Sequence, residues 1–551
     1  MRSVFLIFIC CGVLASCSPK KQKVDLLVYD TSIYTMDKDS SKYTAMAISD
    51  GRIVDVGNEE ILKKYSGEIE LKLTGKFIYP GLIDAHSHFY GLGESMVTVD
   101  LRGIESEEDM NSKVREFYSV ETPSSSTKKS TSVQGRGWDQ NLWESKKFPT
   151  NVELNKMFPD IPVCLKRIDG HAALVNQKAL DMAGIDENSK ISGGEFIKEN
   201  GKLTGVLIDN AVDLVTAKLP EPTKEEKKHA ILKAEKECLK YGLTTVCDAG
   251  IDKVLIDLYD EMHKSGELQI RIYAMANPTQ PTLNWLLENG PFKTDRLHVT
   301  SVKYYMDGAM GSRGACLLED YSDQPGHKGF LLNSIDSLRG LAKILKENNL
   351  QLNVHCIGDS NNRVTLKIMA EVLGDDSTSR WRIEHMQLIS ELDLKYLEQL
   401  KIIPSMQPTH ASSDFPWVLE RIGNDRFRLA YAFKTCLLRS GTIALGTDFP
   451  VEEINPFKTY FAAITERGFL EDSEDLAYGN VKVQTAKKKV KPEHLTPYET
   501  LRGMTIWAAY AQFEENEKGS LEKNKFADFI VMDQDIFTST KEDLDKLIPF
   551  Y

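Results

Sequence analysis

Two histidines with one residue between them follow a short apolar run near the start of the chain. Residues 77–83 are mostly apolar and are followed, two residues later, by His86 and His88. A short apolar run with glycine and proline predicts a buried strand, on which these two side chains face the same side. Two imidazoles side by side can chelate a borderline cation such as zinc. Two polar loop residues would show the same spacing, so the pair alone leaves both interpretations open.

Further ionisable residues lie toward the ends of later apolar runs. They are Lys303, His355, His385 and Asp448. A single histidine is more often a core or surface residue than a ligand. Unrelated residues would scatter over both ends of their strands, whereas these fall toward the predicted C-terminal ends. The coincidence favours one site shared by distant parts of the chain.

The strands that carry these residues alternate with helical segments. After the run at 77–88, we predict strands near 244–249, 270–276, 299–307, 350–357, 381–386, 402–406 and 443–448. Capping boxes formed by Thr223 with Glu226 and by Thr496 with Glu499 predict two helices, the second running to about Phe513. Eight strands with helices between them indicate an α/β fold, a (β/α)8 barrel whose chemistry lies at the C-terminal strand ends.

Both ends of the chain supply short strands outside this barrel. Residues 24–76 contain three apolar runs, and Asp50-Gly51 between the second and third is typical of a tight hairpin. Residues 527–532 form another apolar run, which we expect to join the N-terminal strands. The predicted organisation is a composite β-sandwich from 24–76 and 514–551 around a barrel over 77–513.

The connection after the first barrel strand is too long for an ordinary loop. About 150 residues separate the first two predicted strands, which predicts an inserted subdomain at about 90–240 over the barrel mouth. Within it, residues 122–132 are rich in Ser, Thr and Lys and predict a surface loop. Trp138 could line a substrate pocket, or it could pack in the core of the insert.

The composition is ordinary for a large folded protein and argues against a nucleic-acid partner. The 551 residues are 41% apolar and 27% charged. Their net charge of -13 is opposite to the basic face that phosphate binding needs. The six cysteines beyond residue 17 lack CxxC spacing. An exported chain could pair them, but their apolar neighbours favour buried free thiols.

The N-terminus has the pattern of an export signal. Arg2 precedes an apolar run at 4–14 that is too short to span a bilayer. The run ends in Leu14-Ala15-Ser16-Cys17, which resembles a bacterial lipobox. This resemblance implies a signal peptide over 1–17 and a lipid anchor on Cys17, with the protein on the periplasmic face of the outer membrane. An uncleaved anchor helix or an ordinary signal peptide is the alternative.

Six segments of the chain together resemble the metal-dependent amidohydrolase superfamily, and within it the YtcJ-like branch, or amidohydrolase family 3. They are PGLIDAHSH, VKYYMDGAMGSRGA, NVHCIGD, RIEHMQL, ALGTDFPV and GSLEKNKFADFIVMD. The resemblance covers about residues 24–540. It implies a (β/α)8 barrel joined to a composite β-sandwich.

The resemblance also implies a divalent metal, most often zinc, with one or two ions. The matching positions are His86, His88, Lys303, His355, His385 and Asp448. Lys303 matches a lysine that related enzymes carboxylate to bridge two metals. A neutral lysine can take up carbon dioxide, and its carbamate is an anionic oxygen ligand. A buried ammonium paired with Asp307 is the alternative, and it would leave the metal count open.

The implied activity is hydrolysis of a non-peptide C–N bond by metal-activated water. Asp448 is expected to move the proton from water to the leaving nitrogen, or else to be a passive ligand. Arg167 and His171, in a segment resembling one that recurs in the branch, are expected to reach the substrate as an oxyanion donor or carboxylate clamp. An internal Arg–Asp ion pair is the alternative for this segment.

The expected substrate is a small linear amide, such as an N-acyl or N-formyl amine. Hydrolysis of a cyclic amide, deamination and a non-catalytic ligand-binding lipoprotein are the other interpretations, because a fold does not name its substrate. A homo-oligomer is also compatible with the sequence.

Overall fold

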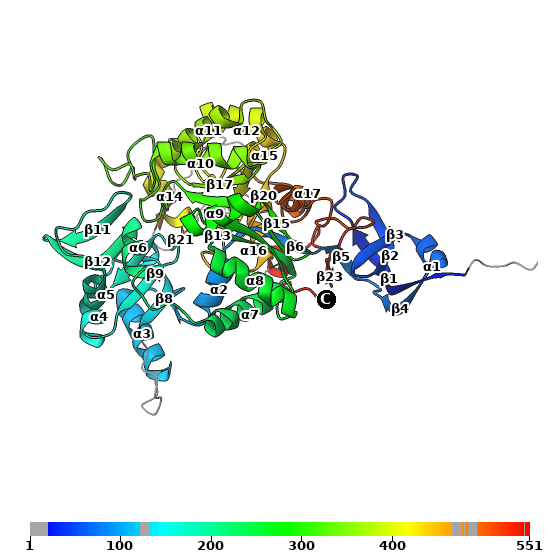
Figure 1. Cartoon of the computed structure of the whole chain (residues 1–551), viewed down its shortest axis with the longest axis horizontal. Helices are drawn as coiled ribbons and strands as arrows, with labels where there is room; N and C mark the ends of the chain where they lie inside the picture. The colour runs from blue at the N-terminus through cyan, green and yellow to red at the C-terminus, as the bar shows by residue number, and fades with distance from the viewer. Residues whose placement is uncertain are drawn as a thin grey trace, which may run out of the picture.

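The described residues form three parts that lie in a row in Figure 1, with the insert on the left, the barrel in the centre and the terminal sheet on the right. The computed structural model describes residues 20–121, 132–465, 477–478, 481–482, 493–544 and 546–550. The predicted signal segment with Cys17, and nearly all of the tract 122–132, lie outside these residues. No helix within the described part is both long and apolar enough to cross a bilayer.

The central part is a sheet of eight parallel strands interleaved with helices, so the predicted (β/α)8 barrel is confirmed. Its strands are β6 (Leu82–Ser87), β13 (Leu243–Ile251), β14 (Arg271–Ala276), β16 (Leu297–Tyr305), β17 (Gln351–Cys356), β18 (Arg382–His385), β19 (Ile403–Met406) and β20 (Ala444–Leu445). The helices that follow or cover them include α7 (Lys224–Lys240), α8 (Lys253–Ser265), α9 (Gln280–Asn289), α10 (Ile335–Glu347), α11 (Asp359–Leu373), α12 (Leu394–Leu400), α15 (Phe433–Ser440) and α16 (Pro456–Thr465).

The last barrel strand is shorter than predicted, and the loop after it completes the barrel. Thr447 Oγ1 donates to Asp84 Oδ2 at 2.7 Å, and Asp448 N–H donates to His86 O at 2.8 Å. A Cβ on Gly446 would lie 2.5 Å from His86 N, so this approach of the two backbones requires glycine. The barrel therefore closes where the predicted ligands of its first and last strands meet.

Strands from both ends of the chain share one sheet, as predicted. The sheet contains β1 (Gln22–Tyr34), β2 (Lys42–Ser49), β3 (Arg52–Gly57), β4 (Tyr65–Lys72), β5 (Phe77–Pro80) and β23 (Phe529–Met532), with α1 (Glu59–Lys64) beside it. β23 runs antiparallel to β5, and β5 runs parallel to β1. Asp50 and Gly51, both with positive φ, form the predicted hairpin turn between β2 and β3.

The prediction of one first strand over 77–88 was wrong, because this segment is two strands in two sheets. β5 pairs with β23 in the terminal sheet, whereas β6 pairs with β13 in the barrel. The change of partner occurs where Gly81 N–H donates to Asp528 O and Leu82 N–H donates to Gly242 O. Pro80 has no N–H to continue the first ladder, which favours a boundary at this position.

The predicted helix from Thr496 to about Phe513 is also interrupted. Its capping box is present, but the segment divides into α17 (Pro497–Gly503) and α18 (Ile506–Ala511). Thr505 between them has φ -139° and ψ -99°, and its hydroxyl donates to Leu501 O at 2.6 Å. A threonine hydroxyl can satisfy backbone groups locally and so compete with helix continuation.

The insert has its own six-stranded sheet. Its elements are β7 (Val99–Asp100), α3 (Glu107–Glu121), β8 (Val133–Trp138), α4 (Val152–Met157), β9 (Val163–Arg167), β10 (Ala172–Val175), α5 (Gln177–Ala183), β11 (Gly194–Glu199), β12 (Lys202–Asp209) and α6 (Asn210–Thr216). Trp138 is fully buried in the core of the insert, and its Nε1 donates to Leu165 O at 2.7 Å. Trp138 therefore packs as a core residue, and the expectation that it lines a substrate pocket was wrong.

The cysteines of the described residues are all free thiols. Cys164, Cys238, Cys247, Cys356 and Cys436 are buried, and Cys316 is half-buried. This confirms the interpretation from their apolar neighbours, and the fold relies on packing rather than on cross-links among these residues.

Replacing Gly446 with alanine should destabilise the barrel at its closure. The new methyl group would overlap the backbone of β6, and overpacking of this kind costs about 1–3 kcal/mol of unfolding free energy. Denaturant unfolding measures the effect. Gly340→Ala in α10 is the matched control, because no atom lies within 4 Å of its Cβ position. That variant should be neutral or up to about 1 kcal/mol more stable, and equal midpoints for both variants would contradict the closure argument.

Candidate metal centre

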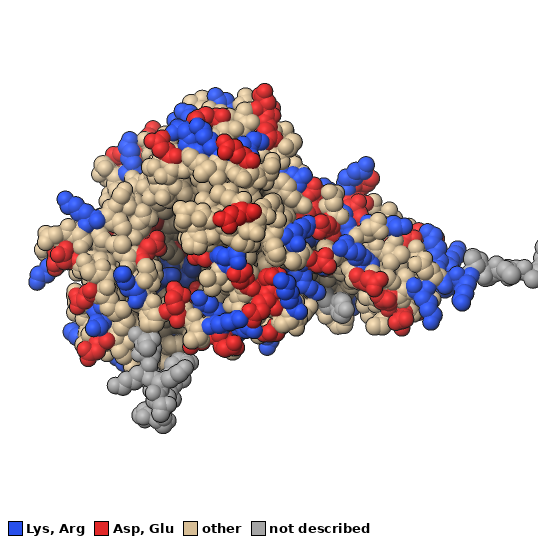
Figure 2. Space-filling view, in the orientation of Figure 1, with Lys and Arg blue, Asp and Glu red and all other residues tan. Residues whose placement is uncertain are grey.

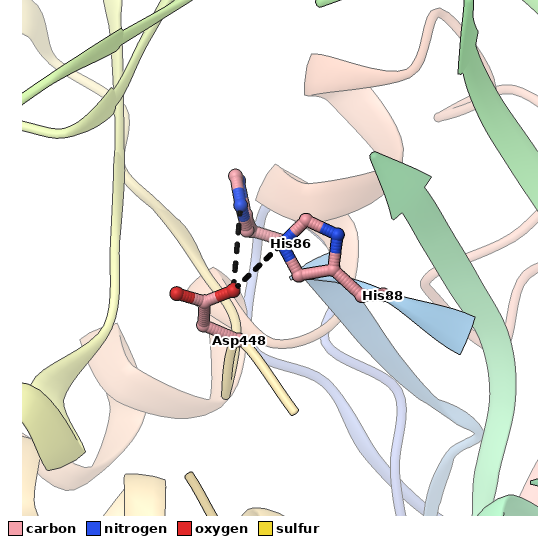
Figure 3. A group of neighbouring side chains, drawn as sticks. All are labelled: His86, His88 and Asp448. Atoms are coloured by element: carbon pink, nitrogen blue, oxygen red, sulfur yellow. Dashed lines mark ion pairs between the residues drawn. The ribbon is translucent and has the colours of Figure 1, made fainter. Parts of the chain in front are cut away.

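The histidines of the first barrel strand meet the aspartate that follows the last one. His88 Nε2 lies 3.3 Å and His86 Nε2 lies 3.6 Å from the same oxygen, Asp448 Oδ1. Figure 3 shows both imidazoles directed at this carboxylate. Residues some 360 positions apart in the sequence are thus within the reach of one cation.

The candidates from the other strands surround this group. Lys303 Nζ on β16 lies 3.2 Å from His86 Nε2. His385 Nδ1, at the end of β18, lies 3.8 Å from Asp448 Oδ2. The ring of His355 on β17 lies 4.4 Å from that of His385, measured between centroids. All six predicted metal-site residues are therefore gathered at the C-terminal rim of the barrel.

Contacts at Nδ1 set the orientation of three imidazoles. His86 Nδ1 contacts Glu384 Oε2, His88 Nδ1 contacts Ala249 O at 3.1 Å, and His385 Nδ1 contacts Gln407 Oε1 at 2.8 Å. Each partner is an acceptor, so Nδ1 carries the proton and Nε2 keeps its lone pair. Such outer contacts are typical of metal-binding histidines.

Burial keeps the clustered imidazoles neutral. Desolvation, reinforced by Lys303, lowers the pKa of His86 to about 4. Desolvation and neighbouring imidazoles hold the pKa values of His355 and His385 well below the ordinary value. Burial alone would raise the pKa of Asp448, but the hydrogen bond from His410 and the other neighbouring imidazoles bring it well below its usual range. His86, His355 and His385 are therefore neutral nitrogen donors beside the carboxylate of Asp448.

Two buried atoms of this set lack a hydrogen-bond partner among the described residues. They are His355 Nε2 and Asp448 Oδ1. Leaving such atoms unpaired costs about 1–3 kcal/mol each, unless another group completes them. Nitrogen donors with a carboxylate suit zinc and similar cations, so the residues fit a divalent metal. His86, His88 and Asp448 form one possible ligand group.

His410 is a member of the site that the sequence analysis missed. It lies on α13 (Pro408–Ser413) after β19, with Nε2 3.1 Å from Asp448 Oδ2 and Nδ1 3.0 Å from Glu452 Oε1. Burial would lower its pKa, but these two carboxylates raise it well above the ordinary value. With His385 and Asp448 it forms a second possible ligand group. The sequence could have indicated this residue, because His410 follows shortly after the predicted strand 402–406.

Lys303 is fully buried and is not paired with Asp307. No ion pair joins them in the described part of the chain. Asp307 instead accepts from the backbone N–H groups of Cys316, Ile357 and Gly358 and from the Asn361 side chain. Burial lowers the pKa of Lys303 to about 8. The ion-pair alternative for this lysine was therefore wrong, and burial makes its ammonium lose its proton more readily than that of an exposed lysine.

Comparison with known proteins agrees with this arrangement. The profile of the amidohydrolase family matches residues 70–548. The chain belongs to the amidohydrolase family. It is 30% identical to the protein LONG AFTER FAR-RED 3 of Arabidopsis thaliana, covering 94% of this chain and 89% of the relative. It is 29% identical to the putative amidohydrolase YtcJ of Bacillus subtilis, covering 92% and 93%.

The chain is also similar to one named enzyme and to one solved structure. The N-substituted formamide deformylase of Arthrobacter pascens is 23% identical, over 93% of this amidohydrolase and 94% of the relative. The crystal structure of an uncharacterized metal-dependent hydrolase from Pyrococcus horikoshii superposes with a TM-score of 0.75 at 26% identity. That alignment covers 95% of this amidohydrolase and 99% of the other chain.

The insert contributes the other wall of the site. A cavity of about 340 Å³ is lined by His88, His355, His385 and Asp448 from the barrel and by Arg167 and His171 from the insert. A larger adjoining cavity of about 1480 Å³ is lined by His171, Lys303 and Tyr305 together with helices of both parts. Figure 2 shows this face hollowed at the junction of insert and barrel.

The two substrate-side candidates have different surroundings. Arg167 is almost fully buried and forms ion pairs with Asp139 and Asp169, so the ion-pair alternative describes its contacts. His171 Nδ1 lies 2.6 Å from Asp209 Oδ1, and its ring centroid lies 5.0 Å from that of His355. His171 therefore reaches the barrel site, with its Nδ1 held from behind.

Zinc should bind this amidohydrolase and raise its unfolding temperature. A ligand that binds only the folded state stabilises it by about 4 kcal/mol at 1,000 times its Kd. His86→Asn should remove most of this effect, because it deletes one donor of the first ligand group. His298→Asn is a buried control at the opposite end of β16, where it faces Glu514. Metal content and thermal unfolding with and without zinc provide the measurement, and equal zinc shifts in both variants would contradict the assignment.

Proposed function

We propose that this amidohydrolase is a metal-dependent enzyme that cleaves a linear, non-peptide C–N bond in a small amide, such as an N-formyl or N-acyl amine. The observation that carries the proposal is the convergence of His86, His88 and His385 on Asp448. The similarity to a formamide deformylase and to a metal-dependent hydrolase supports it.

A divalent cation held by these residues supplies a water of lowered pKa and polarises a carbonyl oxygen. Asp448 is the proton acceptor best placed for the reaction. One of its oxygens is buried without a hydrogen-bond partner among the described residues, and the other contacts His410 at 3.1 Å. Asp448 takes a proton from the attacking water and delivers it to the leaving nitrogen, since a carboxylate can carry a proton on either oxygen.

Lys303 supplies a further ligand after modification. Its amine is fully buried, has a pKa lowered to about 8 by that burial, and lies against His86. A neutral amine that adds carbon dioxide and loses a proton becomes a carbamate, whose oxygens would be ligands for a second cation. The two ligand groups that share Asp448 support a site for one or two ions.

His171 donates a hydrogen bond to the substrate oxygen. Asp209 accepts from Nδ1, and although burial alone would lower the pKa of His171, Asp209 raises it above its ordinary value. The protonated ring can therefore donate from Nε2 toward the cavity. Asp209 is itself fixed, because its N–H donates to His171 O at 2.7 Å and its side chain lies against Gly308 and Gly314. A donor fixed in advance stabilises a developing oxyanion without reorganisation. Arg167, whose charge is matched by Asp139 and Asp169, shapes the segment that carries His171.

A screen of the metal-loaded protein against N-formyl amines, N-acyl amines, N-acyl amino acids and cyclic imides tests the proposal. We expect equal release of carboxylate and amine from a linear amide. Asp448→Asn should lower kcat by at least about 100-fold, the usual scale of general acid–base catalysis. Metal analysis of this variant distinguishes loss of the proton acceptor from loss of a ligand. Ammonia without carboxylate would indicate deamination instead. Full turnover of the variant with metal bound would remove the acid–base role of Asp448.

Replacing His171 with asparagine should impair turnover without loss of metal. Removal of one oxyanion donor costs about 100- to 1,000-fold in kcat, and Asp209→Asn should show part of this loss. His263→Asn, whose Nε2 contacts Ile270 O outside the site, is the control. Steady-state kinetics with metal analysis separate the cases: if His171→Asn loses its metal, the residue is a ligand, and if it turns over normally, it does not contact the substrate oxygen.

A further inference from the structure

An arginine and a glutamate lie inside the barrel, directly beneath the candidate metal centre. Arg382 and Glu384 are two residues apart on β18, and both side chains are fully buried. Arg382 Nε lies 2.7 Å from Glu384 Oε1, and Arg382 Nη2 donates to Glu384 Oε2 at 3.1 Å. The guanidinium therefore contacts both oxygens of the carboxylate, one through a hydrogen bond and the other through a charge contact without hydrogen-bond geometry.

Further hydrogen bonds hold the arginine in place. Arg382 Nη2 donates to Ser405 Oγ at 2.7 Å and to Ala85 O at 2.6 Å. Ala85 immediately precedes His86 on β6, so the same guanidinium is tied to the backbone of the first strand. Glu384 consequently has little freedom to move relative to that strand.

The remaining contact of Glu384 is with a predicted metal ligand. Its Oε2 accepts from His86 Nδ1, which leaves His86 Nε2 facing Lys303 and Asp448. His88 and His385 are oriented by a carbonyl and an amide, both neutral, whereas His86 is oriented by a carboxylate. A buried ion pair gives little net stability compared with apolar side chains of the same size. The contact with His86 is therefore the distinctive consequence of placing this pair inside the barrel.

We propose that Glu384, clamped by Arg382, is a positioning residue that sets the tautomer and ring orientation of His86 and so raises the affinity of the site for a divalent cation. The inference rests on the metal site of the proposed function, but not on the identity of the substrate. Outer partners of metal-binding histidines typically contribute 10- to 100-fold in metal affinity. The negative charge of Glu384 beside Nδ1 also increases the basicity of His86 Nε2 as a metal ligand.

Zinc affinity of the full chain tests the proposal without any substrate. Competition with a chromophoric chelator measures the zinc Kd, and the absorption spectrum of the cobalt-loaded protein reports the ligand arrangement. Glu384→Gln alone leaves the Arg382 charge buried and unpaired, which can prevent folding. Two double variants avoid this: Arg382→Met with Glu384→Gln keeps an acceptor for His86 Nδ1, and Arg382→Met with Glu384→Leu removes it. Both are uncharged at these positions.

We expect the Leu double variant to bind zinc 10- to 100-fold more weakly than the Gln double variant, with a changed cobalt spectrum. His298→Asn is the control, because this buried ring faces Glu514 at the other end of β16, and its zinc affinity should equal that of the wild type. Equal zinc affinities and cobalt spectra for the two double variants would overturn the proposal. Failure of the wild type to bind zinc would instead overturn the metal site of the proposed function, so the two failures are distinguishable.

Discussion

Asp448 reaches the histidines of the first strand because the backbone after β20 is hydrogen-bonded to β6. Asp448 N–H donates to His86 O, and Thr447 donates to Asp84. β20 itself contributes only two residues, so these hydrogen bonds, rather than a longer strand ladder, join the last part of the barrel to the first. The position of the carboxylate is thus set by the same hydrogen bonds that complete the fold. Asp448 also has a positive φ of 63°, a conformation that costs energy and persists only when its surroundings hold it.

This arrangement places charged and polar side chains in the interior of the barrel. Branched apolar residues usually fill such barrels, yet here Lys303, Arg382 and Glu384 are fully buried. Pairing offsets part of the desolvation of Arg382 and Glu384, and the contact of Lys303 Nζ with His86 Nε2 does so for Lys303. Neutral imidazoles complete the set, because burial disfavours their protonated forms. A metal ion would satisfy His355 Nε2 and Asp448 Oδ1, which have no hydrogen-bond partner among the described residues.

The insert is joined to the site through Asp209. This residue has a φ of 49°, and a Cβ on Gly308 or Gly314 would lie within 2.4 Å of its carboxylate oxygens. The glycines of the GAMGSRGA segment are therefore explained by the close approach of an aspartate from another part of the chain. Through this contact the insert places His171 beside His355. Covering the barrel mouth also encloses the space in which a substrate would bind.

The sequence by itself determined the barrel, the sharing of a sheet by the two termini, the presence of an insert and the six residues gathered at the rim. Each of these follows from local signals: apolar runs of strand length, capping boxes, turn residues and histidines or aspartate at strand ends. Only the tertiary structure showed the division of 77–88 between two sheets, since the run is continuous and its partners are distant. Only the tertiary structure also showed that His410, Glu384 and Asp209 belong to the site, because each contacts a site residue 38 or more positions away in the sequence. Trp138 illustrates the limit most directly, because an aromatic residue beside a predicted pocket has the same local pattern whether it faces the cavity or the core, and packing alone decides.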